Sequence, residues 1–149
     1  MDYLWDTSIL IHHTRNSNLF DEINAQHHFF EAPNRSFLSI VSLGEIYSIA
    51  VQRNWGKRKR ETLEHAVSML NPLTIAKRTV IQAYAEIDPY SQGKHPKKRL
   101  PSGMSVRNIG KNDLWIAATA YVIGSRLVTT DQDFRHLDGT YLDVVWIQQ

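Results

Sequence analysis

The sequence contains no cysteine. A chain without thiols forms no disulfide, offers no thiol nucleophile, and holds no zinc ion or iron–sulfur cluster through thiolates. No apolar run approaches the ~20 residues that span a bilayer, and the first residues lack the basic and then apolar pattern of a signal peptide. These absences exclude disulfide scaffolds and membrane-spanning proteins, and they predict a protein of the reducing cytoplasm.

Net charge is almost absent as well. Seventeen lysines and arginines stand against 15 acids, so the net charge is +2 with histidine neutral. A balance this small does not by itself indicate a nucleic-acid partner. The length of 149 residues suits one domain, and 42% hydrophobic residues suffice for an ordinary core. We therefore expect a single domain over residues 1–149.

Short apolar segments alternate with helical patterns along the chain. Ser42 and Glu45 form a Ser-x-x-Glu capping box, Asn112 suits a second helix cap, and Gly124 suits a helix end. We expect strands near residues 3–5, 37–41, 73–75, 126–130 and 144–147. We expect helices near residues 9–15, 42–53, 60–70, 77–87 and 113–123. This alternation predicts a three-layer α/β fold with a mainly parallel sheet of four to five strands flanked by helices.

Four acids follow the predicted strands. Asp6 ends the first strand, and Glu45 lies one turn into the helix after the second. Asp113 begins its helix, and Asp131 ends the next strand. Because ligands bind beyond the carboxyl ends of strands in parallel sheets, we expect these side chains to share one edge. Crowded carboxylates raise one another's pKa unless a cation relieves the repulsion, and an all-oxygen set favours Mg²⁺ or Mn²⁺ over zinc.

Each of these acids also has a purely structural interpretation. Glu45 completes the capping box, and Asp113 complements a helix dipole. An aspartate at a strand end, such as Asp6 or Asp131, often serves as a turn residue or cap. The joint placement of four acids from different elements at one predicted edge favours a shared site.

The segments around these acids resemble the motifs of the PIN domain family. Their order and spacing are similar to those of compact VapC-type members, which are toxins of prokaryotic toxin–antitoxin pairs, and the likeness covers nearly the whole chain. The four segments are Trp5-Asp6-Thr7-Ser8, Ser42-Leu43-Gly44-Glu45-Ile46, Asn112-Asp113-Leu114-Trp115-Ile116-Ala117-Ala118-Thr119-Ala120 and Leu127-Val128-Thr129-Thr130-Asp131-Gln132-Asp133-Phe134.

The resemblance implies a Rossmann-like sheet and a metal-dependent endoribonuclease that uses one or two Mg²⁺ or Mn²⁺ ions. It also implies a homodimer and a small inhibitory antitoxin protein. The implied catalytic and metal-binding acids are Asp6, Glu45, Asp113 and Asp131. Asp133 is a fifth candidate ligand, with a cap on the turn into Phe134 as its alternative. Polar neighbours of the acids are candidates for hydrogen bonds to them, with caps and turns as the alternative: Thr7, Ser8, Asn112 and Thr130.

Positive charge is concentrated in two segments that contain no acid. The first runs from Arg53 to Arg60, and the second lies in a polar stretch over residues 88–111 that we expect to be a long loop. Both are expected to hold RNA phosphates, with a solvated surface as the alternative, and nearby Trp55, Tyr90 and His95 are candidates for stacking on bases. The candidate RNA-binding residues are Arg53, Lys57, Arg58, Lys59, Arg60, Lys94, Lys97, Lys98, Arg99, Arg107 and Lys111.

Other interpretations are weaker. An aspartyl phosphatase or phosphotransferase needs a second carboxylate two residues after its nucleophile, and Ser8 occupies that position after Asp6. A non-catalytic RNA-binding or scaffolding module stays open, although the presence of all four acids argues against it. No Gly-x-Gly-x-x-Gly follows a strand, which disfavours dinucleotide binding. The adjacent histidines of His12-His13 and His27-His28 point apart, so packing is favoured over a metal site.

Overall fold

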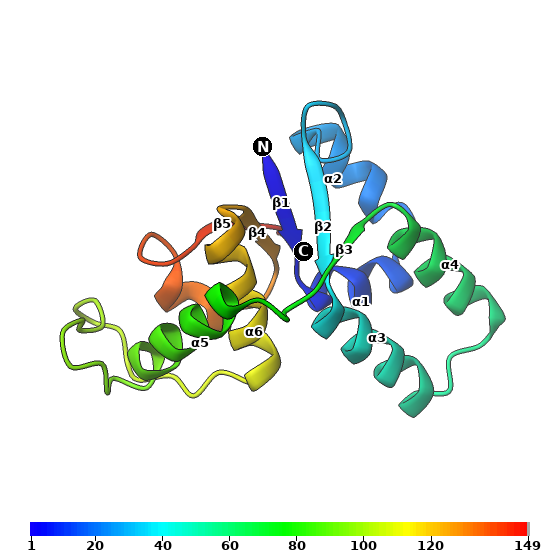
Figure 1. Ribbon diagram of the computed structural model, residues 1–149. Helices are drawn as coiled ribbons and strands as arrows, with labels where there is room; N and C mark the ends of the chain where they lie inside the picture. The colour runs from blue at the N-terminus through cyan, green and yellow to red at the C-terminus, as the bar shows by residue number, and fades with distance from the viewer. Residues whose placement is uncertain (149) are drawn as a thin grey trace.

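A computed structural model describes residues 1–148 as a five-stranded parallel sheet flanked by helices. The strand order is β3-β2-β1-β4-β5, so the chain first builds outward from β1 in one direction and then in the other. This reversal places the switch point of the sheet between β1 and β4 (Figure 1). The strands are β1 (Asp2–Trp5), β2 (Arg35–Ser39), β3 (Asn71–Leu73), β4 (Arg126–Thr129) and β5 (Asp143–Trp146).

Helices cover both faces of the sheet, which confirms the predicted three-layer α/β fold. Trp5 faces a core built with α1 to α4, whereas Leu4 faces a second core built with α5, α6 and the 3₁₀ helix η1. The alternation of neighbouring side chains on β1 thus separates the two cores. The helices are α1 (Thr7–Arg15), α2 (Leu19–His27), α3 (Ile40–Gln52), α4 (Lys57–Ser68), α5 (Arg78–Ser91), α6 (Lys111–Ile123) and η1 (Gln132–Leu137).

Two predicted helix caps, Ser42 and Asn112, are wrong. Helix α3 begins at Ile40, and its cap is Ser39, whose hydroxyl accepts a hydrogen bond from Val41 N at 3.1 Å. Ser42 is therefore buried inside the helix and forms no capping box with Glu45. The apolar run that the sequence assigns to a strand is split between β2 and the first turn of α3, because an apolar run alone does not distinguish the two.

Helix α6 also starts earlier than expected. Its N-cap is Gly110, and Lys111 is its first residue, so Asn112 lies inside the first turn and its amide is free to bond elsewhere. The expected end is confirmed, because Gly124 adopts the left-handed conformation with φ of 64°.

Helix α2 is absent from the sequence-based expectation. Its residues are mostly polar, so it shows little periodicity, yet Phe20 and Ile23 are buried and Phe20 packs on Trp5 with ring centroids 4.8 Å apart. Tertiary packing of one short apolar face therefore stabilises a helix that the helix propensity of its residues does not predict.

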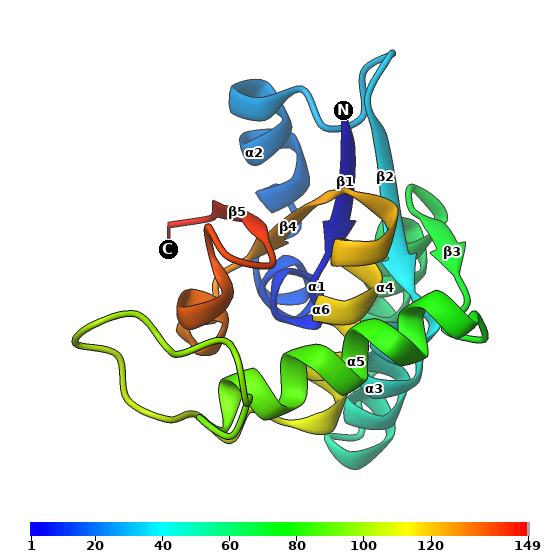
Figure 2. The ribbon, with the colours of Figure 1, turned by 60° about the vertical axis from the view of Figure 1, so that its left-hand side comes forward.

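Helix α5 runs to Ser91, beyond the predicted end at residue 87, and carries Pro89 inside its last turn. Burial of Tyr90 in the second core and the contact of Ser91 Oγ with His136 Nε2 outweigh the backbone hydrogen bond that proline cannot make. The long loop is thus shorter than predicted and spans residues 92–110, and it extends away from the body of the molecule (Figure 2). Pro72 lies within β3, an edge strand that tolerates it.

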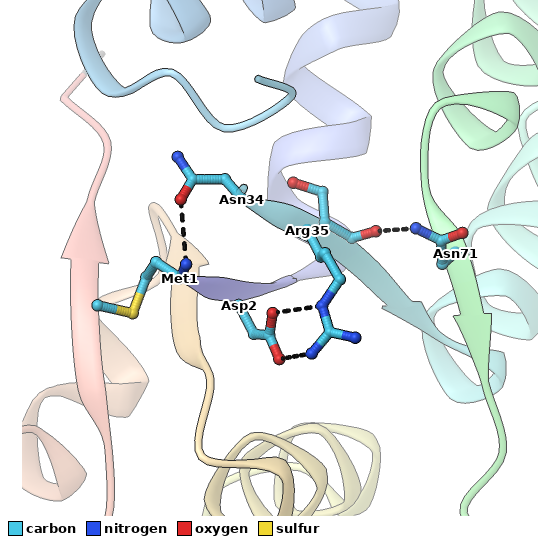
Figure 3. A network of polar contacts seen from close by, with 6 residues as sticks. Met1, Asp2, Asn34, Arg35 and Asn71 are labelled. Atoms are coloured by element: carbon cyan, nitrogen blue, oxygen red, sulfur yellow. Dashed lines mark hydrogen bonds and ion pairs between the residues drawn. The ribbon is translucent and has the colours of Figure 1, made fainter. Parts of the chain in front are cut away.

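The amino edge of the sheet is fastened by polar contacts between the first residues of its strands (Figure 3). Arg35 holds both carboxylate oxygens of Asp2, at 2.8 and 2.6 Å. The N-terminal ammonium donates to Asn34 Oδ1 at 3.1 Å, and Asn71 Nδ2 donates to the carbonyl of Ser36 at 3.0 Å. None of the helices described over residues 1–148 is long and apolar enough to cross a membrane.

Candidate functional site

The carboxyl edge of β1 carries Asp6, a carboxylate that is only 2% exposed. Its backbone N donates to Val128 O at 3.0 Å, so Asp6 continues the pairing of β1 with β4 to the switch point of the sheet. Burial raises the pKa of Asp6, and the nearby charge of Asp131 adds to that shift. Hydrogen bonds from Ser8 and Thr129 act in the opposite direction, because they favour the ionised form.

Two hydroxyls hold one oxygen of Asp6. Ser8 Oγ and Thr129 Oγ1 each donate to Asp6 Oδ2 at 2.7 Å. Ser8 Oγ also accepts from Thr130 N at 3.3 Å, and Thr129 Oγ1 accepts from Asp131 N at 2.9 Å. The orientation of Asp6 is therefore tied to the chain segment that ends β4.

Thr129 is the residue that sequence reasoning missed, because the expectation names its neighbour Thr130. The strand register identifies Thr129. Because β1 and β4 are parallel and Trp5 pairs with Val128, the next residue of β4, Thr129, lies beside Asp6. Of the other polar neighbours, Ser8 bonds to Asp6 as expected. Thr7 is different, because its hydroxyl is buried without a hydrogen-bond partner among residues 1–148.

Glu45 reaches the same edge from α3. Its Oε2 accepts a hydrogen bond from Asn112 Nδ2 at 2.8 Å, a contact between side chains 67 residues apart in the chain. Asn112 thus orients an acid and does not cap its own helix. The hydrogen bond also links the first turn of α6 to α3, two helices that pack against each other.

Asp113 lies among the other acids. Burial raises its pKa to about 7, and the charges of Asp6, Asp131, Glu45 and Asp133 push in the same direction. The effect of all four charges on one carboxyl group places these five acids in one electrostatic neighbourhood, although they come from distant parts of the chain.

Asp131 and Asp133 belong to the turn that follows β4. Asp131 caps η1, because its Oδ1 accepts from Asp133 N at 2.9 Å. The cap into Phe134 is therefore Asp131 rather than Asp133. The carboxylate of Asp133 instead forms an ion pair with Arg107, whose Nη1 lies 3.2 Å from Asp133 Oδ1.

The chemistry of the donor set fits a hard divalent cation. The site offers only carboxylate, hydroxyl and amide oxygens, and within residues 1–148 no lysine or arginine forms an ion pair with Asp6, Glu45, Asp113 or Asp131. The part of the chain that the structure describes contains no group of three or more acidic, histidine or cysteine side chains already arranged as an ion cage. The acids therefore share one region without converging on one point.

A model of the PIN domain family, described simply as PIN domain, matches residues 3–140. That match covers nearly the whole chain. The chain belongs to the PIN domain family. The resemblance noted in the sequence is thereby confirmed, and its family is one of nucleases.

Solved structures share the fold of this PIN domain at low sequence identity. The matched chain in VapBC2 from Rickettsia felis, bound to a DNA fragment from the promoter, is 20% identical, with a TM-score of 0.77 and coverage of 99% of this chain and 100% of that one. The matched chain in VapBC-1 from nontypeable Haemophilus influenzae is 20% identical, with a TM-score of 0.70 and coverage of 98% of this chain and 98% of that one. The matched chain in VapBC-5 from Mycobacterium tuberculosis, a member of a family of toxin–antitoxin systems, is 24% identical, with a TM-score of 0.65 and coverage of 98% of this chain and 98% of that one. No curated protein matches the sequence.

The first basic segment of this PIN domain connects α3 to α4. Trp55 is buried beneath Lys59, whose Nζ lies 5.1 Å from the ring centroid, so the indole is not available to stack on a base. Arg60 Nε donates to the carbonyl of Trp55 at 2.8 Å and thereby closes the turn after α3. Arg53, Lys57 and Arg58 are exposed, although Lys57 lies 3.8 Å from Glu61.

The second basic segment is also partly occupied by local contacts. Tyr90 is buried against Tyr141, so the stacking role predicted for it is wrong. The His95 ring is turned inward, because its Nε2 lies 2.8 Å from Glu86 Oε2 and its Nδ1 accepts from the backbone N of Lys97 and Lys98. Exposed cations of the segment are Lys94, Lys97, Lys98, Arg99 and Lys111, while Arg107 is half-buried.

The histidine pairs do not form a metal site within the described residues. His13 packs against Phe20 with ring centroids 4.1 Å apart, and His27 stacks on Phe29 at 4.9 Å. His28 ends α2 and lies 3.0 Å from Glu31. Packing and local pairing thus account for these side chains, as the spacing indicates.

Proposed function

We propose that this PIN domain is a VapC-type endoribonuclease that cleaves RNA phosphodiesters with one or two Mg²⁺ or Mn²⁺ ions. The observation that carries the proposal is the gathering of four acids at the switch point of a parallel sheet, where none of them is paired with a lysine or arginine within residues 1–148. Such a cluster raises pKa values and costs stability, so it needs a functional reason.

The residues proposed to hold the ions are Asp6, Glu45, Asp113 and Asp131, with Asp133 available only if it leaves Arg107. A bound divalent ion lowers the pKa of a water molecule and offsets the charge that develops on phosphodiester oxygens. The hydroxyls of Ser8 and Thr129 fix the buried Asp6 carboxylate in one orientation before any ligand arrives. Asn112 does the same for Glu45, so two of the acids have positioning partners.

An RNA substrate is favoured by exposed cations that two segments of the chain provide. The loop over residues 92–110 carries exposed cations and reaches Asp133 through Arg107, so it can offer positive charge to a phosphate backbone near the acids. The exposed cations after α3 face the end of α1 and offer a second phosphate-binding surface. Those segments concentrate the positive charge of a chain whose net charge is only +2. The near-neutral total therefore results from opposite charges in different parts of the chain.

We further propose that the chain forms a homodimer and is inhibited by a small antitoxin protein, because its structural neighbours are toxin–antitoxin complexes. A groove of about 690 Å³ beside α3 supports such a partner. Its walls include apolar side chains such as Ile40, Ile49 and Trp115, and Glu45 of the acid cluster also lines it. Sedimentation of the isolated chain as a monomer at micromolar concentration would count against the dimer.

A cleavage assay on single-stranded RNA tests the enzymatic proposal. The wild type is expected to cut RNA with Mn²⁺ or Mg²⁺ and to stop on addition of EDTA, whereas an Asp6→Asn/Asp113→Asn double variant loses the activity. The matched control is Asp2→Asn/Asp143→Asn, which removes two carboxylates from the amino edge of the same sheet. Full metal-dependent cleavage by the Asp6→Asn/Asp113→Asn protein would sink the proposal.

A non-catalytic RNA-binding module is the second candidate. It is favoured by one observation, namely that the described acids form no ready-made ion cage. The two candidates differ in one readout, because a binding module retains RNA in the presence of Mn²⁺ without shortening it. Mapping of RNA 5′ ends after expression of the wild type and of Asp113→Asn separates them in cells and identifies the target.

A further inference from the structure

A second polar hollow lies next to the acid cluster. It has a volume of about 330 Å³ and is formed where the loop after α5 meets η1. The polar side chains that line it are Ser102, Ser105, Arg107, Arg135 and His136. No carboxylate lines this hollow, which distinguishes it from the site on the other side of Asp133.

Arg107 stands between this hollow and the acids. Its Nη1 contacts Asp133 Oδ1 at 3.2 Å, and Asp133 is two residues after Asp131. Arg107 and Asp133 also line an adjoining hollow of about 370 Å³. Arg107 therefore lines the polar hollow while its guanidinium contacts Asp133, which lies two residues from the proposed metal-binding Asp131.

The backbone fixes the position of Arg107. Its N donates to the carbonyl of Ser91 at 2.8 Å, which closes the neck of the loop against the end of α5. Gly93 is required at this neck, because it has φ of 67° and a Cβ there would come within 2.8 Å of Val106 Cγ2. The backbone of the long loop is thus held in place at Val106 and Arg107, next to the end of α5.

Arg135 provides a second guanidinium to the same hollow from η1. Its residue is exposed, and within residues 1–148 it forms no ion pair. An unpaired arginine has five N–H donors in a planar fork that matches the oxygens of a phosphate group. Arg107 and Arg135 therefore give the hollow a cationic lining.

His136 forms part of the wall of the hollow. The residue is 1% exposed, and its Nε2 lies 2.7 Å from Ser91 Oγ. Its Nδ1 is buried and has no hydrogen-bond partner of ordinary geometry among residues 1–148, although the backbone of Asp133 lies nearby. His136 therefore joins the wall of the hollow to Ser91 at the end of α5, where the loop begins.

We propose that this hollow is a phosphate subsite that binds an internal backbone phosphate of the RNA, next to the phosphate held at the acids. The inference rests on the proposed function, because it assigns a second contact point on the same substrate. The loop over residues 92–110 is then a substrate-positioning element, and Arg107 and Arg135 are its phosphate-binding side chains. A phosphate held there adds affinity for any base sequence, since phosphate contacts position a strand without reading it.

Binding of short RNA in EDTA tests the subsite without requiring cleavage. The probe is a fluorescein-labelled oligouridylate with a 5′-hydroxyl end, and its affinity is measured by anisotropy over a range of salt concentrations. Arg135→Gln is expected to weaken binding about tenfold and to reduce the slope of log affinity against log salt by about one. Arg107→Gln should act in the same direction. An oligoadenylate should show the same losses.

The matched control is Arg126→Gln, which removes one guanidinium at the amino edge of the sheet, where Arg126 pairs with Asp143 at 2.6 Å. It should keep both the affinity and the salt slope. Arg135→Lys adds a second check, because it keeps the charge but loses the fork, so the slope stays while affinity falls. Thermal unfolding of each variant verifies that it is folded.

Three outcomes would overturn the subsite. The first is unchanged affinity and slope in both Arg135→Gln and Arg107→Gln while the wild type binds RNA, which leaves the proposed function intact. The second is a loss that appears only with 5′-phosphorylated RNA, which indicates a terminal phosphate as the occupant. The third is an equal loss in Arg126→Gln, which indicates a general charge effect. A wild type that neither binds nor cuts RNA would remove the proposed function as well.

Discussion

Asp2 and Asp6 lie four residues apart at the two ends of β1, and their carboxyl groups have opposite surroundings. At the amino edge, two hydrogen bonds from Arg35 lower the pKa of Asp2. At the carboxyl edge, burial raises the pKa of Asp6, and no cation pairs with it within the described residues. One edge is thus built for ion pairing, and the other concentrates like charges.

The rest of the sheet repeats this difference. Arg126 pairs with Asp143 at the amino ends of β4 and β5, while Asp113 and Asp131 stand near Asp6 at the opposite edge. The charges of the amino edge stabilise the fold, whereas those of the carboxyl edge oppose it unless a cation binds. The contrast indicates that the acid cluster is retained for function rather than stability.

The largest effect on RNA cleavage is expected when an acid of the cluster is replaced. Glu45→Gln keeps the shape of the side chain and its bond from Asn112 but removes a charge, so RNA cleavage should fall by at least ~100-fold. The measurement is the initial rate of cutting with saturating Mn²⁺. Glu61→Gln, whose side chain is exposed on α4, is the control and should cut at the wild-type rate. Equal rates for the two variants would show that Glu45 is outside the active site.

A smaller effect follows from removing a positioning hydroxyl. Thr129→Val deletes the 2.7 Å hydrogen bond to Asp6 Oδ2 and leaves every acid in place. We expect a loss of about 10–100-fold in Mn²⁺ affinity or cleavage rate, with partial recovery in Thr129→Ser. The comparison variant is Thr62→Val, which loses only an exposed bond to Arg58 O. If Thr129→Ser has no higher Mn²⁺ affinity or cleavage rate than Thr129→Val, Thr129 acts through packing rather than through its hydroxyl.

A third prediction concerns stability and pH. The folded chain holds the Asp113 proton more tightly than the unfolded chain, because the folded pKa is about 7 and the ordinary value is 3.8. The contribution of Asp113 to stability is therefore complete below its unfolded pKa and is lost as the pH rises through about 7.

Asp113→Asn should accordingly unfold at a higher temperature than the wild type in metal-free buffer at about pH 8. After allowance for partial solvent access we expect a gain of about 2 kcal/mol, or ~4–8 °C in Tm. The gain should shrink as the pH falls towards 4, which thermal scans over this range measure. A Tm for Asp113→Asn below that of the wild type at every pH would contradict the account.

The smallest effect is expected at the amino edge. Arg35→Gln breaks the ion pair with Asp2, which is partly solvent-exposed and screened by salt, so Tm should fall less than it rises in Asp113→Asn. RNA cleavage should stay at the wild-type rate. A large loss of RNA cleavage in Arg35→Gln would contradict the assignment of the amino edge to stability alone.

The general plan of the fold and of the acid cluster was predictable, because both depend on short-range pattern. Apolar runs followed by Asp6 and by Asp131 mark strand ends, and parallel strands bring their carboxyl ends to one edge. Glu45 and Asp113 were expected at the same edge because they lie near the starts of helices, and the family resemblance implied the same two residues.

The details that failed depend on contacts between distant residues. The local pattern assigns Asn112 to a helix cap, which is wrong, whereas its alternative role as a hydrogen-bond partner of an acid is confirmed by a bond to Glu45 that crosses 67 positions. Tyr90 and Trp55 appear in basic stretches and suggest base stacking, but the second core and the turn after α3 bury them. The starting turn of α3 was misplaced because Ser39 and Ser42 are equally good caps until tertiary packing selects one.

Binding of Mn²⁺ measured by electron paramagnetic resonance tests the central claim most directly, because it counts bound ions without RNA. The account predicts that the wild type binds Mn²⁺, that Asp2→Asn/Asp143→Asn binds it equally well, and that Asp6→Asn/Asp113→Asn loses it. Equal binding by the two double variants, or none by the folded wild type, would contradict the assignment of the unpaired acids to a cation site.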